Sequence, residues 1–197
     1  MHSLQFTAES PSNGMLERDF LVGDVPGVLW SPASAAADRA PLILMAHGGG
    51  NHKKHPAMSG RARRLVTSCG FHVAVIDAPG HGDRPRTVHD EAEIAELFRA
   101  RAAGEPEGPI VVRYNAHLAE LAVPEYQASL DALQELPEVG TDGLVGFWGL
   151  NLGTDRRPAG GDRTEDHGRG PRAALARRPG RTGEADHHPD RVRPAVG

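Results

Sequence analysis

The chain has 197 residues, a formal net charge of −4 and a single cysteine. This length suits one domain with a core of its own, and the mild acidity gives no reason to expect a nucleic acid or an anionic membrane as a partner. The one cysteine, Cys69, excludes an intrachain disulfide and favours a reducing compartment, and we expect it to be a small buried hydrophobe. The N-terminus lacks the pattern of a signal peptide, and no apolar run approaches the roughly 20 residues of a membrane span, so we expect a soluble, cytoplasmic protein.

The first part of the chain predicts short strands and turns. Strands are expected at residues 4–7, 20–22 and 28–30, with turns at 12–14 and 26–27, where Asn-Gly and Pro-Gly supply turn-forming residues. Residues 41–47 and 71–77 are continuous apolar runs, and we expect each to form a strand that is buried on both faces.

Helical spacing follows each of these two runs. Helices are expected at 57–68, 90–103 and 114–136, with interruptions at 104–109 and at Pro124. Leucines in the last stretch recur at helical spacing and are interpreted as packing residues: Leu118, Leu121, Leu130, Leu133 and Leu136. Strands that alternate with helices predict the α/β class, with a mostly parallel sheet covered by helices on both faces.

The composition changes abruptly after Thr154. Residues 155–197 are rich in Arg, Gly, Pro and Asp and contain no Phe, Tyr, Trp, Ile, Met or Lys. Such a segment buries too little apolar surface to offset an ordering entropy of about 1–2 kcal/mol per residue. We therefore expect a disordered C-terminal tail that follows a globular part, residues 1–154.

Two origins of this tail remain open. One is a natural basic tail, although its seven Asp and Glu residues offset much of the arginine charge. The other is a frameshift, because lysine occurs only at Lys53 and Lys54 while arginine is abundant, as GC-rich coding DNA gives. Back-translation of residues 154–175 with a shift of one base permits a helix followed by a buried strand. We favour the frameshift hypothesis.

A strand-like run at 144–148 leads directly into Gly149-Leu150-Asn151-Leu152-Gly153. A strand that runs into G-x-S-x-G is the nucleophile elbow, a tight turn that presents a serine at the end of a sheet. Here Asn151 stands at the serine position, which keeps the frame of the turn and removes the hydroxyl group. An amide nitrogen is no useful nucleophile, because its lone pair is delocalised.

Two further motifs follow the two buried strands. His47-Gly48-Gly49-Gly50 comes directly after the first, and Asp77-Ala-Pro-Gly-His-Gly-Asp83 directly after the second. The first resembles the H-G-G-G oxyanion motif of lipases and esterases, and the second resembles the D-x-P-G-H-G of α/β-hydrolases. Together with the elbow, they make the chain similar to bacterial α/β-hydrolases near the esterase and dienelactone-hydrolase branch, over residues 20–154.

This resemblance implies an α/β-hydrolase fold represented by its N-terminal part. It implies hydrolysis of an ester, lactone or similar acyl bond of a small molecule, with an oxyanion hole formed by Gly48, Gly49 and Leu152. The family also needs a catalytic acid and a histidine after the nucleophile, and residues 155–197 match neither segment. We therefore expect that the chain as written folds poorly and has no serine-hydrolase activity, with Asn151 at the nucleophile position.

Parts of these motifs also occur in GTPases and in metal sites. A GTPase needs G-x-x-x-x-G-K-[ST], and the loop after Gly48 lacks both the second glycine and the hydroxyl residue. The histidines of the two loops (His47, His52, His55, His81) match no metal-ligand spacing, so neither a metal nor a cofactor is expected. Lys53 and Lys54 are interpreted as a solvated pair at a helix start.

The alternative function is a non-catalytic binding or regulatory protein that keeps the pocket. The sequence predicts neither the substrate nor the oligomeric state.

Overall fold

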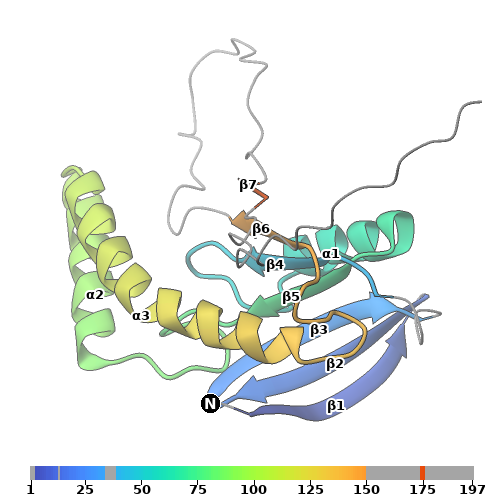
Figure 1. The fold of residues 1–197 in the computed structure, drawn as a ribbon. Coiled ribbons are helices and arrows are strands. Elements are labelled where there is room, and N and C mark those ends of the chain that lie inside the picture. The colour runs from blue at the N-terminus through green and yellow to red at the C-terminus, as the bar shows by residue number, and fades with distance from the viewer. Residues whose placement is uncertain (1–2, 13, 34–38, 150–173, 176–197) are drawn as a thin grey trace, which may run out of the picture.

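The computed structural model describes residues 3–12, 14–33, 39–149 and 174–175. Its strands form one sheet in the order β1-β2-β3-β5-β4-β6-β7 (Figure 1). Helices α1 and α3 contact this sheet, and α2 packs against α3. The strands are β1 Leu4–Ser12, β2 Met15–Val22, β3 Val25–Pro32, β4 Leu42–Ala46, β5 His72–Ile76, β6 Val145–Gly149 and β7 Ala174–Leu175. The helices are α1 Pro56–Cys69, α2 Val88–Ala103 and α3 Gly108–Gln134.

The sheet is mixed. β4 pairs in parallel with β5 on one side and with β6 on the other. β1, β2, β3 and β5 pair antiparallel in turn, and β7 pairs antiparallel with β6. The α/β class is confirmed, with the parallel strands coming from the apolar runs that predicted them.

The β1–β3 meander corrects one predicted turn. Pro26 and Gly27 are paired with β2 inside β3, and the turn lies earlier in the chain, at Gly23-Asp24, where Gly23 has φ +63°. The Phe20 ring occupies the space where a Cβ atom of Gly27 would lie, within 2.2 Å of it. Gly27 therefore makes room for a buried aromatic ring and does not bend the chain. The predicted turn before β2 is confirmed at Gly14, with φ +80°.

Alternate residues of the central strands enter two separate cores, one on each face of the sheet. The α1-side core consists of Met15, Val28, Trp30, Met45, Met58, Ala62, Val66, Val73 and Val75. The α3-side core consists of Phe20, Val22, Val25, Leu29, Leu42, Leu44, Ala74, Ile76, Ala132, Leu133 and Val139. Burial on both faces is the reason that β4 and β5 are continuously apolar, and this prediction is confirmed.

Helix α1 begins at Pro56, with the His55 side chain accepting from the Ala57 N–H, and ends before Gly70, whose φ is +70°. Met58, Ala62 and Val66 follow one another at four-residue spacing and face the sheet. Cys69 is exposed, so its interpretation as a buried hydrophobe is wrong. As the last residue of α1 it lies beyond the turns that pack on the sheet.

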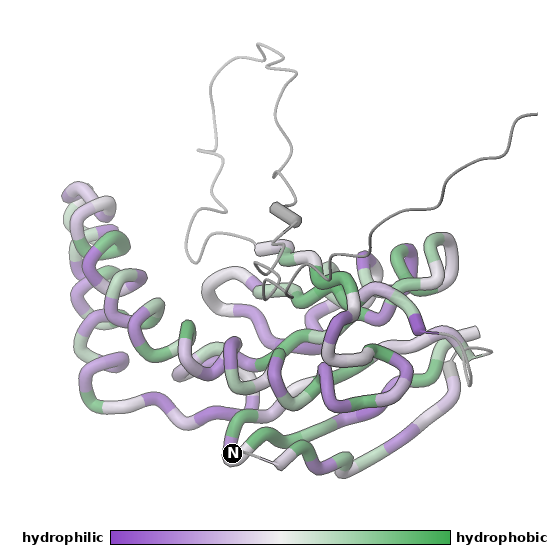
Figure 2. The backbone as a smooth tube through the Cα atoms, viewed as in Figure 1, coloured by the Kyte–Doolittle hydropathy of each residue, from purple (hydrophilic) through white to green (hydrophobic). Residues whose placement is uncertain are grey.

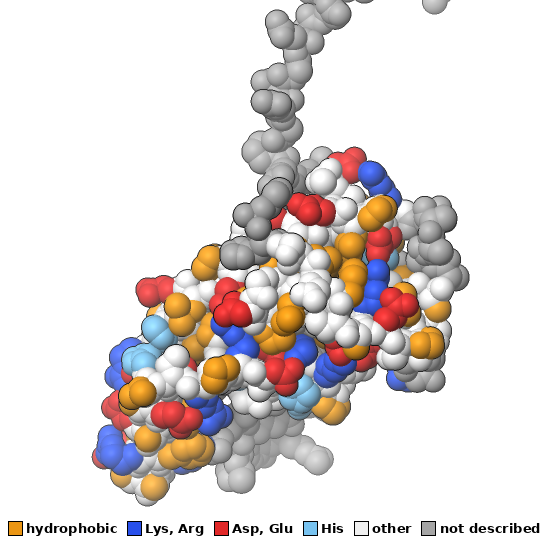
Figure 3. Space-filling view, turned by 90° about the horizontal axis from the view of Figure 1, so that it is seen from below, with side chains coloured by type: hydrophobic (Ala, Val, Ile, Leu, Met, Phe, Trp, Pro, Cys, Tyr) orange, Lys and Arg blue, Asp and Glu red, His pale blue; other side chains and the backbone are white. Residues whose placement is uncertain are grey.

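Helices α2 and α3 form a pair joined at 104–107. The predicted interruption at 104–109 is shorter in the structure, because α3 begins at Gly108 and accommodates Pro109 in its first turn. Hydrophilic and hydrophobic residues alternate along both (Figure 2), and acidic and basic side chains are interspersed on the face shown in Figure 3. Between the two helices, Arg113 donates to Glu93 on α2 at 2.9 and 2.7 Å and to Glu96 at 2.6 Å. The pair begins at a capping box in which Thr87 and Asp90 exchange hydrogen bonds.

The predicted interruption at Pro124 is wrong, because α3 runs through it without a break. The N-terminal half of α3 contacts α2, and its C-terminal half places Ala132 and Leu133 on the sheet. Packing at both ends holds the helix across the one position where proline removes a backbone donor. Leu118 and Leu133 are buried as predicted, but Leu121 is 43% exposed, since spacing alone does not tell which leucines meet a partner.

The predicted tail lies outside the described residues, apart from Ala174 and Leu175. These two residues form β7 beside Gly146 and Phe147 of β6. Within the described part of the chain, no helix is long and apolar enough to cross a membrane.

Candidate active site

The carboxyl ends of the parallel strands β5, β4 and β6 lie at one edge of the sheet, and each leads into a motif-bearing segment. In open α/β sheets this edge is where ligands bind. The loop after β4 spans residues 47–55, and the loop after β5 spans 77–87. The predicted elbow begins at Gly149, the last residue of β6.

The register between β4 and β6 brings two of the motifs together. Ala46 is paired with Gly149, so the H-G-G-G loop and the predicted elbow leave the sheet side by side. Asn151 and Leu152 lie outside the described residues. The structure therefore places the start of the elbow, and not the nucleophile position itself.

Gly48 and Gly49 occupy different environments. Gly48 is buried and Gly49 is exposed, and the turn closes with the Asn51 N–H donating to the Gly48 carbonyl at 3.2 Å. Gly50, with φ +76°, adopts a left-handed conformation that this turn requires. Among the described residues, the N–H groups of Gly48 and Gly49 donate to no other protein group.

His47 joins the two loops at their base. Its Nε2 accepts from the Ala78 N–H at 3.1 Å, so the ring proton lies on Nδ1, 3.0 Å from the Gly48 carbonyl oxygen. The side chain is 1% exposed, and burial lowers the pKa of His47 below its ordinary value. His47 is a neutral structural group, and no free nitrogen remains for it to act as a base.

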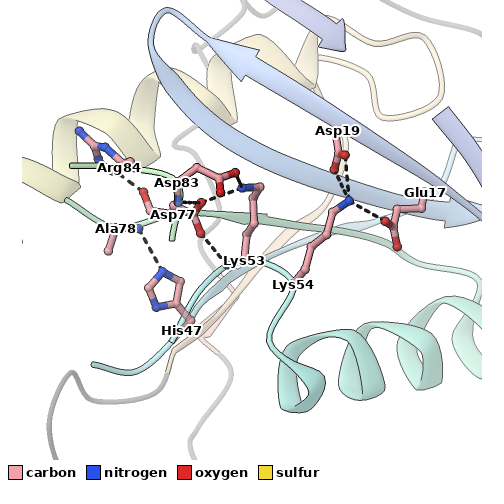
Figure 4. Close-up of polar contacts among 9 residues, drawn as sticks. All are labelled: Glu17, Asp19, His47, Lys53, Lys54, Asp77, Ala78, Asp83 and Arg84. Carbon is pink, nitrogen blue, oxygen red and sulfur yellow. Dashed lines mark hydrogen bonds and ion pairs between the residues drawn. The ribbon is translucent and has the colours of Figure 1, made fainter. Parts of the chain in front are cut away.

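Asp77 is the centre of the second connection between the loops (Figure 4). Its Oδ1 accepts from the Lys53 N–H at 2.6 Å, and its Oδ2 accepts from Lys53 Nζ at 2.7 Å and from the Asp83 N–H at 3.1 Å. Asp77 is fully buried. Lys53 also bonds Asp83, at 2.5 Å. Burial opposes the charge of Lys53, but the bonds to the two carboxylates raise its pKa above the ordinary value.

The prediction that Lys53 and Lys54 form a solvated pair is wrong. Lys53 is buried, and Lys54 bonds Glu17 at 2.8 Å and Asp19 at 2.7 Å, both on β2 (Figure 4). Trp30 Nε1 donates to the other Glu17 oxygen at 2.7 Å. Lys54 thus fastens the approach to α1 onto the meander. The local sequence does not indicate these partners, because those of Lys53 lie 24 and 30 residues later in the chain and Asp19 lies 35 residues before Lys54.

The glycines of the D-A-P-G-H-G-D loop fit it around Asp77. Gly82 has φ +59°, and a Cβ atom on it would lie 2.2–2.3 Å from the Asp77 carboxyl atoms. Gly80 also has a positive φ, +69°, and a Cβ atom on it would lie 3.1 Å from the Asp90 carboxyl group. The glycines of the motif therefore stand where the backbone passes close to the carboxyl groups of Asp77 and Asp90.

A third contact extends this loop to α3 and was missed by sequence reasoning. Arg84 donates to both carboxylate oxygens of Glu125, at 2.6 and 2.8 Å, and lies 3.4 Å from the Asp77 carbonyl. The two partners are 41 residues apart and belong to no common motif, so the sequence carried no signal for the pair.

The loop histidines form no metal cluster in the described residues, where no group of three or more candidate ligands converges. His81 Nδ1 lies 2.8 Å from the Pro79 carbonyl, and its ring centroid lies 5.5 Å from that of His47. The rings of His52 and His55 meet edge to face, with centroids 6.0 Å apart, and His55 is the N-cap of α1.

No known family profile matches the sequence, and no curated protein is similar to it. Solved structures are similar in fold. A protein of Bacteroides fragilis assigned to the acetyl xylan esterases has a TM-score of 0.51 at 13% identity, over 77% of this chain and 42% of that one. A cold-adapted esterase from an Arctic intertidal metagenomic library has a TM-score of 0.47 at 27% identity, over 73% of this chain and 53% of that one.

The sheet order, the loops at its carboxyl edge and the similarity to the Bacteroides structure define an α/β-hydrolase fold. The chain spans about half the length of the solved structures it matches. The predicted fold class is confirmed, and the fold is present in part.

Proposed function

We propose that the chain represents the N-terminal part of a hydrolase that cleaves an ester, lactone or related acyl bond of a small molecule. The observation that supports this most is the pairing of Ala46 with Gly149, which starts the H-G-G-G loop and the elbow motif from adjacent points of neighbouring strands. An acyl-transfer site needs that proximity, because the tetrahedral oxyanion must reach donors from both segments.

In this proposal Gly48, Gly49 and Leu152 supply backbone N–H groups to the oxyanion. Within the described residues no acceptor is found for the first two N–H groups. The glycines also allow an acyl group to approach the backbone closely.

The chain as written has no serine-hydrolase activity under this proposal. Attack on an acyl carbon needs a hydroxyl group and a histidine base that is oriented by an acid. Asn151 offers a delocalised amide, and His47 is committed to the Ala78 N–H. A catalytic acid and a second histidine belong to the half of the fold that residues 155–197 do not resemble.

The assay is hydrolysis of p-nitrophenyl acetate by the purified chain. We expect no saturable turnover, and background release that a serine-reactive phosphonate leaves unchanged. Saturable turnover that the phosphonate abolishes contradicts the proposal. Asn151→Ser serves as the matched variant and is expected to remain inactive, because the serine alone lacks its base.

We further propose that residues 1–154 form the hydrolase part and that residues 155–197 are read out of frame, in a cytoplasmic protein. Resequencing the DNA from codon 151 to codon 155 tests both points. A restored frame with a serine codon at position 151 supports the parent enzyme. An unchanged frame contradicts the frameshift.

One observation favours a second candidate, a non-catalytic binding protein. The contacts of His47, Lys53 and Asp77 are complete although Asn151 replaces the serine. In a binding protein, Asn151 would serve as a hydrogen-bonding group for the ligand. An unchanged DNA frame together with a soluble, monodisperse product supports this candidate over the enzyme.

A further inference from the structure

The loop after β4 and the loop after β5 are connected at two points, His47 to Ala78 and Lys53 to Asp77 (Figure 4). We propose that Asp77 is a positioning residue: through Lys53 it fixes the conformation of residues 48–53 and so aims the Gly48 and Gly49 N–H groups. The role of these N–H groups in binding an oxyanion rests on the proposed function, but their positioning can be measured without it.

Asp77 is suited to this positioning role because its carboxylate bonds both the backbone and the side chain of Lys53. Oδ1 accepts from the Lys53 backbone at 2.6 Å, and Oδ2 accepts from the Lys53 ammonium at 2.7 Å. A single side chain therefore fixes the position of the Lys53 backbone and the direction of its side chain. Charge-assisted bonds of this kind are shorter and stronger than neutral ones.

The carboxylate itself has little freedom to move. It accepts from the Asp83 N–H at 3.1 Å, and Gly82 passes over it so closely that a Cβ atom would come within 2.3 Å. The Asp77 N–H donates to the Pro26 carbonyl of β3 at 2.9 Å. Asp77 is therefore held at the sheet edge, and its bonds to Lys53 hold the loop after β4 relative to that edge.

The connection through His47 shows which part of the loop the Lys53–Asp77 connection can position. His47 fixes the N-terminal end of the loop, and α1 begins at Pro56 at its C-terminal end. Between them, the Asn51 and His55 N–H groups bond carbonyls inside the loop, at 3.2 and 2.9 Å. Lys53 is the residue of this stretch that bonds the loop after β5, while Lys54 next to it bonds β2. The position of residues 48–53 relative to the loop after β5 therefore depends on Asp77.

Hydrogen exchange of the 197-residue chain, read by mass spectrometry, tests the proposal. Asp77→Asn replaces one acceptor oxygen by an NH₂ group that faces an N–H donor. We expect exchange in residues 48–55 to accelerate by roughly tenfold or more, while β3 and the middle of α1 exchange as in the unchanged chain. The matched control is Asp142→Asn, which weakens an ion pair with Arg39 that involves no residue of this loop and should leave residues 48–55 unaffected.

Two outcomes overturn the proposal. Unchanged exchange in residues 48–55 means that Asp77 does not position them. Equal acceleration in β3 and α1 means that Asp77 only supports the fold as a whole. If Asp77→Asn fails to fold, Lys53→Met replaces it, since this change leaves the backbone bond to Asp77. Because Lys53→Met removes only the ammonium bond, a smaller acceleration is expected in residues 48–55, and unchanged exchange there overturns the role assigned to that bond.

Histidine modification by diethyl pyrocarbonate gives an independent readout. His47 is buried and bonded, whereas His52 and His55 in the same loop are more accessible and serve as internal references. We expect Asp77→Asn to increase the modification of His47 relative to the two references, and an unchanged ratio contradicts the proposal. Neither measurement uses ester hydrolysis, so a chain that hydrolyses no ester still tests the positioning.

Discussion

Gly82 has φ +59° and lies directly against the Asp77 carboxyl group. Gly104, the cap of α2, has a similar φ of +69° with nothing within 4 Å of its would-be Cβ atom. We predict that Gly104→Ala destabilises the chain by about 1 kcal/mol, the cost of a left-handed alanine. Gly82→Ala adds a clash with a buried carboxylate and should cost about 3 kcal/mol. Urea unfolding measures both, and equal losses contradict the close approach to Asp77.

His47 and His72 give the stability a pH dependence whose direction is fixed. Burial lowers the pKa of both rings, and Arg18 beside His72 acts in the same direction while Glu138 opposes it. The unfolded chain therefore takes up protons at a higher pH than the folded chain does. We predict that the free energy of unfolding falls as the pH is lowered from about 7.5 to about 5.5, through the ordinary histidine pKa. A constant or rising value in urea titrations at the two pH values contradicts this.

At the residue scale the sequence predicted motifs better than contacts. The glycine-rich and D-A-P-G-H-G-D loops lie at the sheet edge where the resemblance implied them. The burial of Lys53 and the commitment of His47 to Ala78 were not predicted, because both depend on partners 24 and 31 residues away. A charged residue next to another charged residue looks solvated until the fold supplies its counter-ion.

Helix α3 carries Pro124 on its exposed side, within a continuous helix of 27 residues. Proline has no N–H for the carbonyl four residues earlier and crowds the preceding turn. We predict that Pro124→Ala stabilises the chain by about 1–3 kcal/mol, because both ends of α3 are already packed. Thermal and urea unfolding check this. A loss of stability would mean that the proline ring makes a contact that the helix needs.

The elements of the sheet differ in how far sequence predicts them. β4 and β5 were predicted within a residue or two, since continuous apolar runs report burial on both faces. The meander strands are longer than predicted, because polar residues such as Glu17 and Asp19 on β2 bond Lys54 instead of ending the strand. Pro-Gly indicated a turn in β3, yet only the packing of Phe20 on Gly27 explains that glycine.

On the scale of the whole molecule, the β6 end of the sheet carries apolar surface. Leu144 is 63% and Phe147 47% exposed, and in the described residues only the two-residue β7 covers the outer side of β6. Exposed apolar groups beside an unpaired strand edge favour association. We predict concentration-dependent oligomers in size-exclusion chromatography and binding of a hydrophobic dye. Leu144→Ser should reduce both, and a monomeric chain that binds no dye contradicts the prediction.

The central claim is that the chain holds one side of an acyl-hydrolase site and cannot complete the reaction. The most direct test is p-nitrophenyl acetate hydrolysis by the chain and by Asn151→Ser side by side, each with and without a serine-reactive phosphonate. Both proteins are predicted to show only linear background release that the phosphonate does not change. Saturable, phosphonate-sensitive turnover by Asn151→Ser would show that the serine alone was missing. The same turnover by the chain itself would contradict the account entirely.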